Sequence, residues 1–330
     1  MKTSIFRTHQ PSWQGGFDQF LQWGWCNRNE QAFWLRQQVL ARPISSPLRE
    51  ASLIVFTRKP IETALVQELR PDVPGKSSAD WLQQQQNVES GSFWTERNDQ
   101  SQGRLFTSHG SAQWQLERRV DDSSASLLSG LFDAASAQSC YFDGQLTAAG
   151  LTVSGVFTGA MAQRWGKAVA PGFVQVQAQN FQQNEDVKLF AYGHTLASQW
   201  QSREPLALSF AHLKIGQEQH VFDRWLPALT VDAPRLDSFR WQASFVNKTY
   251  RLELIVDGGN PRLVPWAAMN ERLPLGGRRV IKMTPFANLT LTLFKRGETQ
   301  ALKTFKSNQA WLTTAMPGSE VRSRGPVAQA

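Results

Sequence analysis

The sequence has little of what a metal site, a disulfide framework or a membrane span would require. In 330 residues it contains two cysteines, Cys26 and Cys140, and five histidines, none at the spacing of a zinc site. No stretch approaches the roughly 18 apolar residues of a transmembrane helix, and residues 1–10 have no apolar segment typical of a signal peptide. These absences predict a soluble, cytoplasmic protein without a bound metal.

The common catalytic signatures are missing as well. The sequence contains no G-x-G-x-x-G or G-x-x-x-x-G-K-[ST] phosphate-binding loop, no G-x-S-x-G nucleophile elbow and no H-E-x-x-H metal motif. These absences argue against nucleotide-dependent enzymes, α/β-hydrolases and zinc proteases.

Charge is sparse and dispersed. Charged residues make up 19% of the chain, and although the net charge is +8, the basic clusters are as short as Arg118-Arg119 and Lys295-Arg296. A nucleic-acid-binding surface would need a denser basic stripe. We therefore expect no nucleic-acid partner and at most a weak association with anionic membrane surfaces.

What the sequence does have is a period-two alternation of apolar and polar residues, which predicts an all-β protein of antiparallel sheets. Thirteen tryptophans against three tyrosines add large flat apolar surfaces, suited to β cores or to pockets for extended apolar ligands. The alternation predicts strands over residues 51–56, 150–158, 173–181, 250–256 and 289–294.

Helical patterns are few and short. Apolar spacing predicts helices over residues 124–137 and 61–69. Polar composition predicts loops over residues 71–91 and 98–110, and the first of these could be a lid or a simple connection.

The length suggests two domains at roughly 150 residues each. The stretch "QWQSREPL", residues 199–206, predicts a boundary between an N-terminal domain (1–200) and a C-terminal domain (205–316). The tail, residues 317–330, is expected to be disordered.

The strand over residues 173–181 has two distinct faces. Val174, Val176 and Ala178 alternate with Gln175 and Gln177. The glutamines either face water or line the inside of a container, where neutral amides could hydrogen-bond a ligand without the cost of burying charge. The sequence leaves both alternatives open.

The segment "QWGWCNRNEQAFWLRQQVL", residues 22–40, is rich in aromatic residues and places Arg36 in an otherwise apolar strand. A buried arginine needs a carboxylate or a ligand oxygen as its partner. We favour a structural ion pair with Glu50 or Glu96, and the alternative is an arginine that lines a pocket.

Two of these segments resemble a known superfamily. "NEQAFWLRQQVL" followed by "EASLIVFTR", and "AQRWGKAVAPGFVQVQAQNF" with its Trp-Gly turn, resemble the tocopherol cyclase and carotenoid hydratase superfamily, to which the decalin-forming fungal Diels–Alderases are related. "SFRWQASFVNKTYRLELIVDG" and "ANLTLTLFKRGE" match its C-terminal strands in style. The resemblance implies two tandem lipocalin-like antiparallel β-barrel or β-sandwich domains, which hold an apolar ligand in the N-terminal domain or between the two. It also implies cyclisation, hydration or pericyclic ring closure without a cofactor.

The sequence departs from this superfamily at one position. Relatives often carry His-Asn before the Trp-Gly pair, where this chain has Gln163-Arg164. If that histidine donates a proton, another acid must replace it, and the candidates are Asp143, Asp18 and Glu253. Asp143 precedes Gly144, as a turn residue would. The departure shifts the expectation from acid catalysis towards catalysis by shape, or towards binding alone.

The resulting hypothesis is a cofactor-free cyclase acting on an extended polyene, polyketide or isoprenoid. The alternatives are a non-catalytic carrier of a lipid-like metabolite and a structural protein whose hollows are filled by its own tryptophans. The candidate catalytic residues are Arg36, Arg164 and Asp143. The candidate substrate-binding residues are Gln175 and Gln177, which would orient polar groups, and the wall-forming Trp23, Trp25, Trp34, Trp94, Trp165 and Trp241.

Overall fold

The computed structural model describes the greater part of the chain. The described residues are 16–41, 48–71, 84–86, 91–97, 99–120, 126–129, 133–166, 172–182, 186–195, 207–222, 240–273 and 278–315.

The first of two antiparallel sheets holds eleven strands. Its order is β4-β3-β2-β1-β11-β10-β8-β7-β6-β5, and β9 pairs with β10. A single 3₁₀ turn, η1 (Asn27–Asn29), joins the first two strands. The strands are β1 (Gly16–Cys26), β2 (Gln31–Ala41), β3 (Leu48–Thr57), β4 (Glu62–Pro71), β5 (Gln84–Gln86), β6 (Phe93–Glu96), β7 (Gln100–Thr107), β8 (Gly110–Val120), β9 (Ser126–Ser129), β10 (Asp133–Ala148) and β11 (Leu151–Gly166).

The second sheet holds nine strands. Its order is β15-β14-β13-β12-β20-β19-β17-β16, and β18 pairs with β19. The strands are β12 (Gly172–Ala178), β13 (Val187–Thr195), β14 (Ala207–Ile215), β15 (Glu218–Phe222), β16 (Arg240–Val246), β17 (Tyr250–Asp257), β18 (Ala267–Arg272), β19 (Arg278–Lys295) and β20 (Ala301–Ala315).

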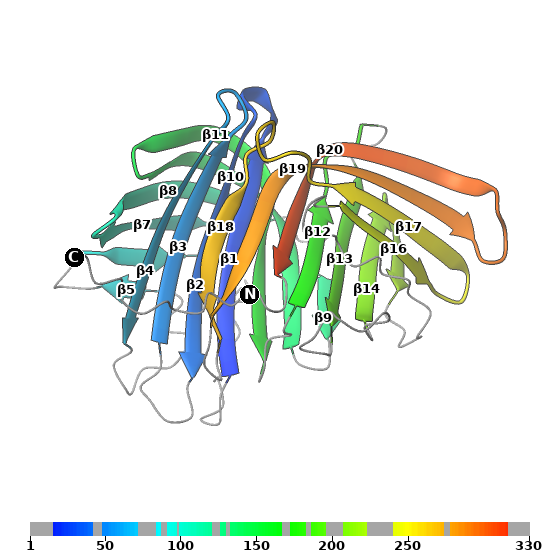
Figure 1. Cartoon of the computed structure of the whole chain (residues 1–330), viewed down its shortest axis with the longest axis horizontal. Coiled ribbons are helices and arrows are strands. Elements are labelled where there is room, and N and C mark those ends of the chain that lie inside the picture. The colour runs from blue at the N-terminus through cyan, green and yellow to red at the C-terminus, as the bar shows by residue number, and fades with distance from the viewer. Residues whose placement is uncertain are drawn as a thin grey trace, which may run out of the picture.

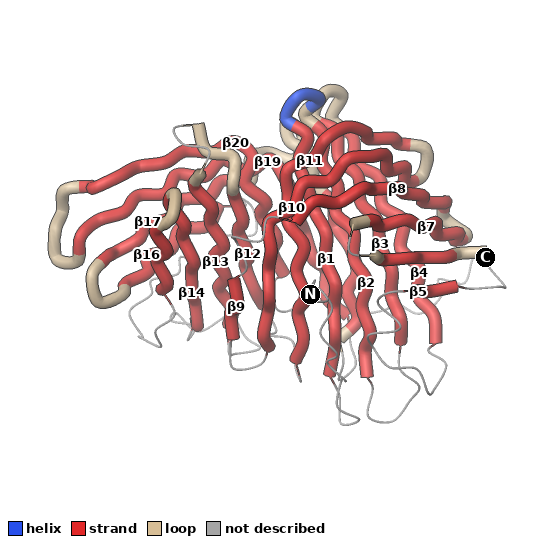
Figure 2. Tube along the Cα trace, turned by 180° about the vertical axis from the view of Figure 1, so that it is seen from behind, coloured by secondary structure: helices blue, strands red, loops and turns tan. Residues whose placement is uncertain are grey.

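Each sheet is curled into a half-barrel, and the two lie side by side (Figure 1). The view from behind shows that strands account for nearly all of the regular structure (Figure 2). The expected all-β fold, consistent with tandem lipocalin-like domains, is therefore confirmed. Among the described residues no helix is long and apolar enough to span a membrane.

The three largest apolar clusters among the described residues hold this arrangement together. One fills the curve of the first sheet around Phe33, Phe142 and Phe157, and another fills the curve of the second sheet around Val176 and Leu291. The third lies between the sheets and takes side chains from both. Each half-barrel thus packs around its own side chains, and the contact between them is a further core.

The central strands of the first sheet explain why this third core exists. Along β1 to β3 nearly every residue is buried, which means that both faces are covered. On β1, Phe20 packs inside the first sheet, whereas its neighbours Leu21 and Trp23 belong to the core between the sheets. Because successive side chains of a strand point to opposite faces, these strands serve two cores at once.

The expected strands are all found, but both expected helices are wrong. Residues 61–69 fall almost entirely in β4, and residues 126–129 and 133–137 form β9 and the start of β10. Residues 98–110, expected to be a loop, contain β7. In each case pairing with a neighbouring strand outweighs the local pattern.

The division between the sheets differs from the expected domain boundary. It lies between Gly166 and Gly172, whereas residues 199–206 fall between β13 and β14, which pair with each other. Most of the loop expected at 71–91 and the whole tail at 317–330 lie outside the described residues.

Candidate functional site

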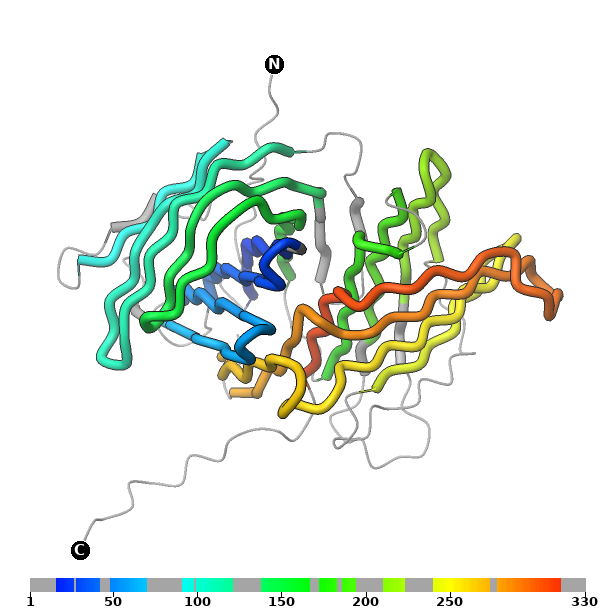
Figure 3. Tube along the Cα trace, turned by 90° about the horizontal axis from the view of Figure 1, so that it is seen from above, coloured from blue at the N-terminus to red at the C-terminus, as the bar shows by residue number. Residues whose placement is uncertain are grey.

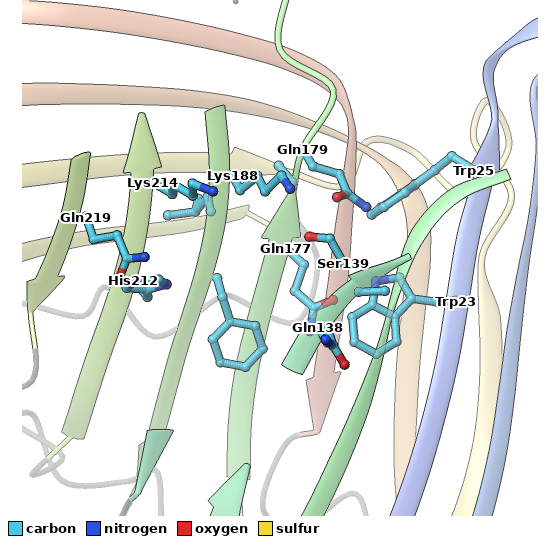
Figure 4. A pocket seen from close by; sticks show the side chains of 14 residues that line it. Trp23, Trp25, Gln138, Ser139, Gln177, Gln179, Lys188, His212, Lys214 and Gln219 are labelled. Carbon is cyan, nitrogen blue, oxygen red and sulfur yellow. The ribbon is translucent and has the colours of Figure 1, made fainter. Parts of the chain in front are cut away.

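A small pocket lies where the two sheets meet (Figure 4). Its volume is about 60 Å³, and its lining combines residues of β1, β10 and β11 with residues of β12 to β15. Three candidate substrate-binding residues, Trp23, Trp25 and Gln177, line it together. Packing of the two sheets against each other thus joins side chains that are about 150 positions apart in the sequence.

The two tryptophans are held firmly by their surroundings. Trp25 donates its indole Nε1–H to the carbonyl of Pro285 in the second sheet at 2.7 Å and meets Trp311 edge to face at 5.7 Å between ring centroids. Behind Trp23, a β-carbon on Gly159 would lie 1.8 Å from the Trp23 carbonyl oxygen. Only glycine allows β11 to approach β1 this closely.

The orientation of the glutamines on β12 answers the question raised by the alternating sequence. Val174, Val176 and Ala178 fill the curve of the second sheet. Gln177 lies on the opposite face, towards the junction, where it lines the pocket. At Gln177 the polar face of β12 therefore points neither into the interior of a barrel nor into open water. It points into the contact between the two sheets.

Gln177 is the least satisfied residue of the pocket. Its side chain is buried, with 5% of the residue exposed. Neither its amide nitrogen nor its amide oxygen has a hydrogen-bond partner among the described residues. Burying an amide without a partner costs free energy, so a group that could pair with it would be bound favourably. Gln175 lies two residues earlier, half-buried and outside the pocket lining.

Basic residues of β13 and β14 complete the lining. Lys188 and Lys214 lie directly opposite each other in the sheet, and His212 precedes Lys214 on the same face. Burial and the charges of His220 and Lys214 lower the pKa of His212, against a hydrogen bond with Gln219 that raises it. The lowered pKa favours the uncharged form of the imidazole.

A larger hollow adjoins this pocket. It has a volume of about 470 Å³ and shares Ser139, Gln179 and Lys188 with the pocket. Its remaining lining is mainly amide and hydroxyl side chains, with Tyr141 and Phe181 as the aromatic members. The hollow has the size of typical ligand sites, roughly 300–1,000 Å³.

The two candidate arginines lie in a buried ionic cluster between the sheets. Arg36 pairs with Glu50, as one of the two sequence alternatives expected, and also with Glu271 at 2.9 Å. Glu271 in turn pairs with Arg279. Burial would raise the pKa of Glu271, but Arg279, Arg36 and Arg164 lower it to below its ordinary value. These contacts join the sheets, which is a structural role for Arg36.

Arg164 reaches across the same contact. Its Nη2 donates to the hydroxyl of Tyr192 at 2.7 Å, and its guanidinium stacks over the rings of Phe17, Phe173 and Tyr192 at 5.2–5.6 Å. Burial lowers the pKa of Arg36 to about 10, so Arg36 remains charged at neutral pH. Neither arginine lines the pocket.

The other candidate tryptophans are dispersed. Trp94 packs against Trp114 inside the first sheet, and Trp241 is buried inside the second. Trp34 belongs to the core between the sheets, beneath Arg36. Trp165 lies on β11 next to Asp18 of β1. The six tryptophans therefore do not form one wall.

The candidate acids also lie apart from one another. Asp143 lies in the middle of β10 rather than in a turn, exposed on the outer face of the first sheet. Glu253 is partly exposed and pairs with Arg251. Asp18 is fully buried, and its carboxylate accepts two hydrogen bonds from Gln163 Nε2 at 3.1 and 3.3 Å. Burial raises the pKa of Asp18 to about 7, although the bonds from Gln163 and the Gln19 backbone lower it.

Glu96, the other expected partner of Arg36, instead forms a network inside the first sheet. It accepts hydrogen bonds from Gln22, Trp94 and Ser101 at 2.5–2.7 Å and pairs with Arg118 at 2.9 Å. Burial raises the pKa of Glu96 even though Arg118 lowers it. Among the described residues, no group of His, Cys, Asp and Glu is arranged to hold a metal ion.

The basic side of the pocket cannot be recognised from the sequence alone. Lys188, Phe190 and Tyr192 alternate along β13, and Phe210, His212 and Lys214 alternate along β14. This alternation shows that each set shares a face. Only the register that places Lys188 opposite Lys214 shows that the two sets are neighbours.

Comparison with known proteins identifies the fold but not a family. No family model matches the sequence, and no curated protein matches it. Among solved structures, a protein from Nitrosomonas europaea with the provisional name AttH superposes with a TM-score of 0.54 and 8% sequence identity, over 96% of this chain and 98% of that one. At 8% identity, the likeness shows a shared architecture of two β half-barrels in tandem and nothing beyond the fold.

Proposed function

We propose that this protein binds an extended apolar small molecule at the junction of its two sheets and promotes its ring closure without a cofactor. The observation that carries the proposal is the pocket itself, in which Trp23 and Trp25 lie beside the buried amide of Gln177, an amide with no hydrogen-bond partner in the described part of the chain. A flat apolar wall beside one polar anchor is the usual composition of a small-molecule site.

The larger hollow supplies the space that the pocket lacks. The pocket alone accommodates one end of a molecule, whereas the adjoining 470 Å³ takes its remaining length. Holding a flexible chain in a folded conformer lowers the entropic barrier to closure, which needs no cofactor. The likeness to AttH and the Trp-Gly segment together support a relationship to the tocopherol cyclase and carotenoid hydratase superfamily.

The charges around the pocket favour one type of closure. A cationic cyclisation develops positive charge on carbon, and Lys188 and Lys214 would oppose that charge. A pericyclic closure develops little charge, and ammonium or amide donors can polarise a conjugated carbonyl of the substrate. We therefore propose a pericyclic reaction at the junction.

Asp18 supports a second candidate, acid-assisted closure within the first sheet. Its pKa of about 7 leaves a substantial fraction protonated at neutral pH, as a proton donor to an alkene requires. Its surroundings on the inner face include Phe20 and Trp165. This candidate predicts that Asp18→Asn abolishes turnover while ligand binding persists.

The test begins with the molecule that copurifies with the protein from cells that express it naturally, identified by native mass spectrometry. Its linear precursor is then incubated with wild-type protein, with Gln177→Leu and with the matched control Gln175→Leu, which lies outside the pocket. We expect wild type and the control to form the cyclic product and Gln177→Leu to lose at least about tenfold in rate.

Two outcomes would contradict the proposal. If the same amount of product formed with and without protein while the protein still bound the ligand, the cyclase hypothesis would be excluded. A carrier of the same ligand would then remain. If Gln177→Leu bound the ligand as tightly as the wild-type protein does, the junction would be excluded as the binding site.

A further inference from the structure

We infer that the polar end of the ligand is a neutral carboxamide, which presents an N–H donor and a carbonyl acceptor on one edge and pairs with both amide atoms of Gln177. The inference rests on the proposed function, because it names the chemistry of the ligand at that same site.

Both polar atoms of the Gln177 side chain are buried without a partner. Only 5% of the residue is exposed, and neither Nε2, which donates, nor Oε1, which accepts, forms a hydrogen bond within the described part of the chain. A buried polar group that lacks a hydrogen bond costs free energy. The residue therefore gains most from a ligand that satisfies its donor and its acceptor together.

The strands beside Gln177 do not supply these hydrogen bonds. In the register of the sheet Gln177 lies opposite Phe190 of β13 and Trp311 of β20. Phe190 has no polar side-chain atom, and Trp311 donates its single indole N–H to Thr313 Oγ1 at 3.1 Å. The Gln177 amide is therefore flanked by aromatic side chains in its own sheet.

The two sides of the pocket use their polar groups elsewhere. Figure 4 shows Gln177 between Trp23 and Trp25 on one side and His212 and Gln219 on the other. Trp25 donates its indole N–H to a backbone carbonyl of the second sheet, and Gln219 is hydrogen-bonded to His212. A ligand that enters between the two sides would thus meet a free amide edge beside a flat apolar wall.

The size of the pocket suits a small flat group. Its volume of about 60 Å³ has room for a few heavy atoms, about a carboxamide and the first carbons of its chain. The remainder of the ligand would extend into the adjoining hollow of about 470 Å³. The polar end of the molecule is therefore the part that Gln177 selects.

Other polar groups satisfy only half of the Gln177 amide. A carboxylate or an ester accepts from Nε2 but leaves Oε1 unpaired, whereas an ammonium donates to Oε1 and leaves Nε2 unpaired. In a trans secondary amide the N–H and the carbonyl point to opposite sides, so that such a group also reaches only one atom. A primary carboxamide forms two parallel hydrogen bonds of nearly linear geometry with the same edge.

The test uses isothermal titration calorimetry with four probes that share one apolar chain: octanamide, N-methyloctanamide, methyl octanoate and octanoate. We expect octanamide to bind the wild-type protein at least about tenfold more tightly than each of the other three, because it alone makes both hydrogen bonds.

Two variants separate recognition by Gln177 from the size of the probes. In Gln177→Leu the preference for octanamide over methyl octanoate should disappear, whereas Gln175→Leu, outside the pocket lining, should retain it. Leucine has a volume close to that of glutamine and no polar atom to leave unpaired. Urea unfolding of ligand-free Gln177→Leu should therefore give a midpoint no lower than that of the wild-type protein, which also shows that the variant folds.

The outcomes distinguish the inference from the proposed function. Octanamide and methyl octanoate of equal affinity would overturn the inference and leave the proposed apolar site intact. The same holds if octanoate binds most tightly, if N-methyloctanamide matches octanamide, or if the preference for octanamide persists in Gln177→Leu. A lower unfolding midpoint for Gln177→Leu would mean that its amide is paired within the protein, which also overturns the inference. Failure of all four probes to bind would overturn the proposed function as well.

Discussion

Asp18 shows how the environment of one residue sets its chemistry. Its carboxyl lies on the inner face of β1, bonded to Gln163 of the neighbouring strand, and no cation pairs with it among the described residues. Burial without a counter-ion favours the neutral form of an acid. Asp18 is therefore expected to make folding stability depend on pH.

The expected dependence has a definite sign. The pKa of Asp18 rises from 3.8 to about 7 on folding, so between these values the folded protein binds more protons than the unfolded chain. The contribution of Asp18 to stability is therefore fully present below about pH 4 and is lost as pH rises towards 7. The difference is on the order of 4 kcal/mol at most.

Asp18→Asn should remove this loss and make the variant more stable than wild type at pH 7 to 8. Urea unfolding between pH 4 and pH 8 measures the effect, with Asp143→Asn, an exposed carboxylate on the outer face, as the control. If the free energy of unfolding of the wild-type protein instead rose relative to that of Asp18→Asn between pH 4 and pH 8, the argument would be contradicted.

Individual residues also show which contacts can be predicted from the sequence and which cannot. The need for a carboxylate beside Arg36 follows from the cost of burying a charge, and Glu50 was one of the two partners expected. Glu271, 235 positions away, could not be identified because its approach depends on how two sheets pack. Glu96 was the wrong alternative since it is held by Arg118 inside the first sheet.

At the scale of elements, alternation predicts strands well but does not indicate which neighbour each face will contact. β12 was expected from its pattern, and its valines do fill a core. What its glutamine face contacts depends on β1 and β11 of the other sheet, which no local pattern reveals. Residues 61–69 have helical spacing, yet residues 62–69 belong to β4 and pair with β3.

β18 joins the two sheets through one buried carboxylate. Glu271 lies on this strand and compensates Arg36 and Arg279 at once. Removing one partner of a buried ion pair leaves the other charge uncompensated, which typically costs about 3–5 kcal/mol. We therefore expect Glu271→Gln to lower the free energy of unfolding by about that amount.

Denaturant unfolding at neutral pH measures this loss. The matched control is Glu253→Gln on the adjacent part of the same sheet, where a partly exposed carboxylate pairs with Arg251 and should contribute about 1 kcal/mol or less. If the two variants lost equal stability, the cluster around Glu271 would not hold the sheets together.

At the scale of the whole molecule, the two half-barrels are not independent bodies. Seen from above, the curved sheets lie side by side, with the first strands of the chain close to the last (Figure 3). The core between them takes Trp23, Trp25 and Trp34 from the first sheet and Met283 and Trp311 from the second. The candidate site lies at this contact, so its integrity requires both sheets.

Separation of the sheets should therefore expose a large apolar face. A fragment of residues 1–168 would present the outer faces of β1 to β3 to water, including Trp23, Trp34 and Phe56. Exposed apolar patches of this kind lead to association. We expect this fragment to aggregate alone and to be soluble when coexpressed with residues 169–330, and size-exclusion chromatography with light scattering distinguishes the two states. If the 1–168 fragment were monomeric and unfolded cooperatively, the shared core would be dispensable for its folding. The junction would then be a contact between two independently folding domains and not part of a single folding unit.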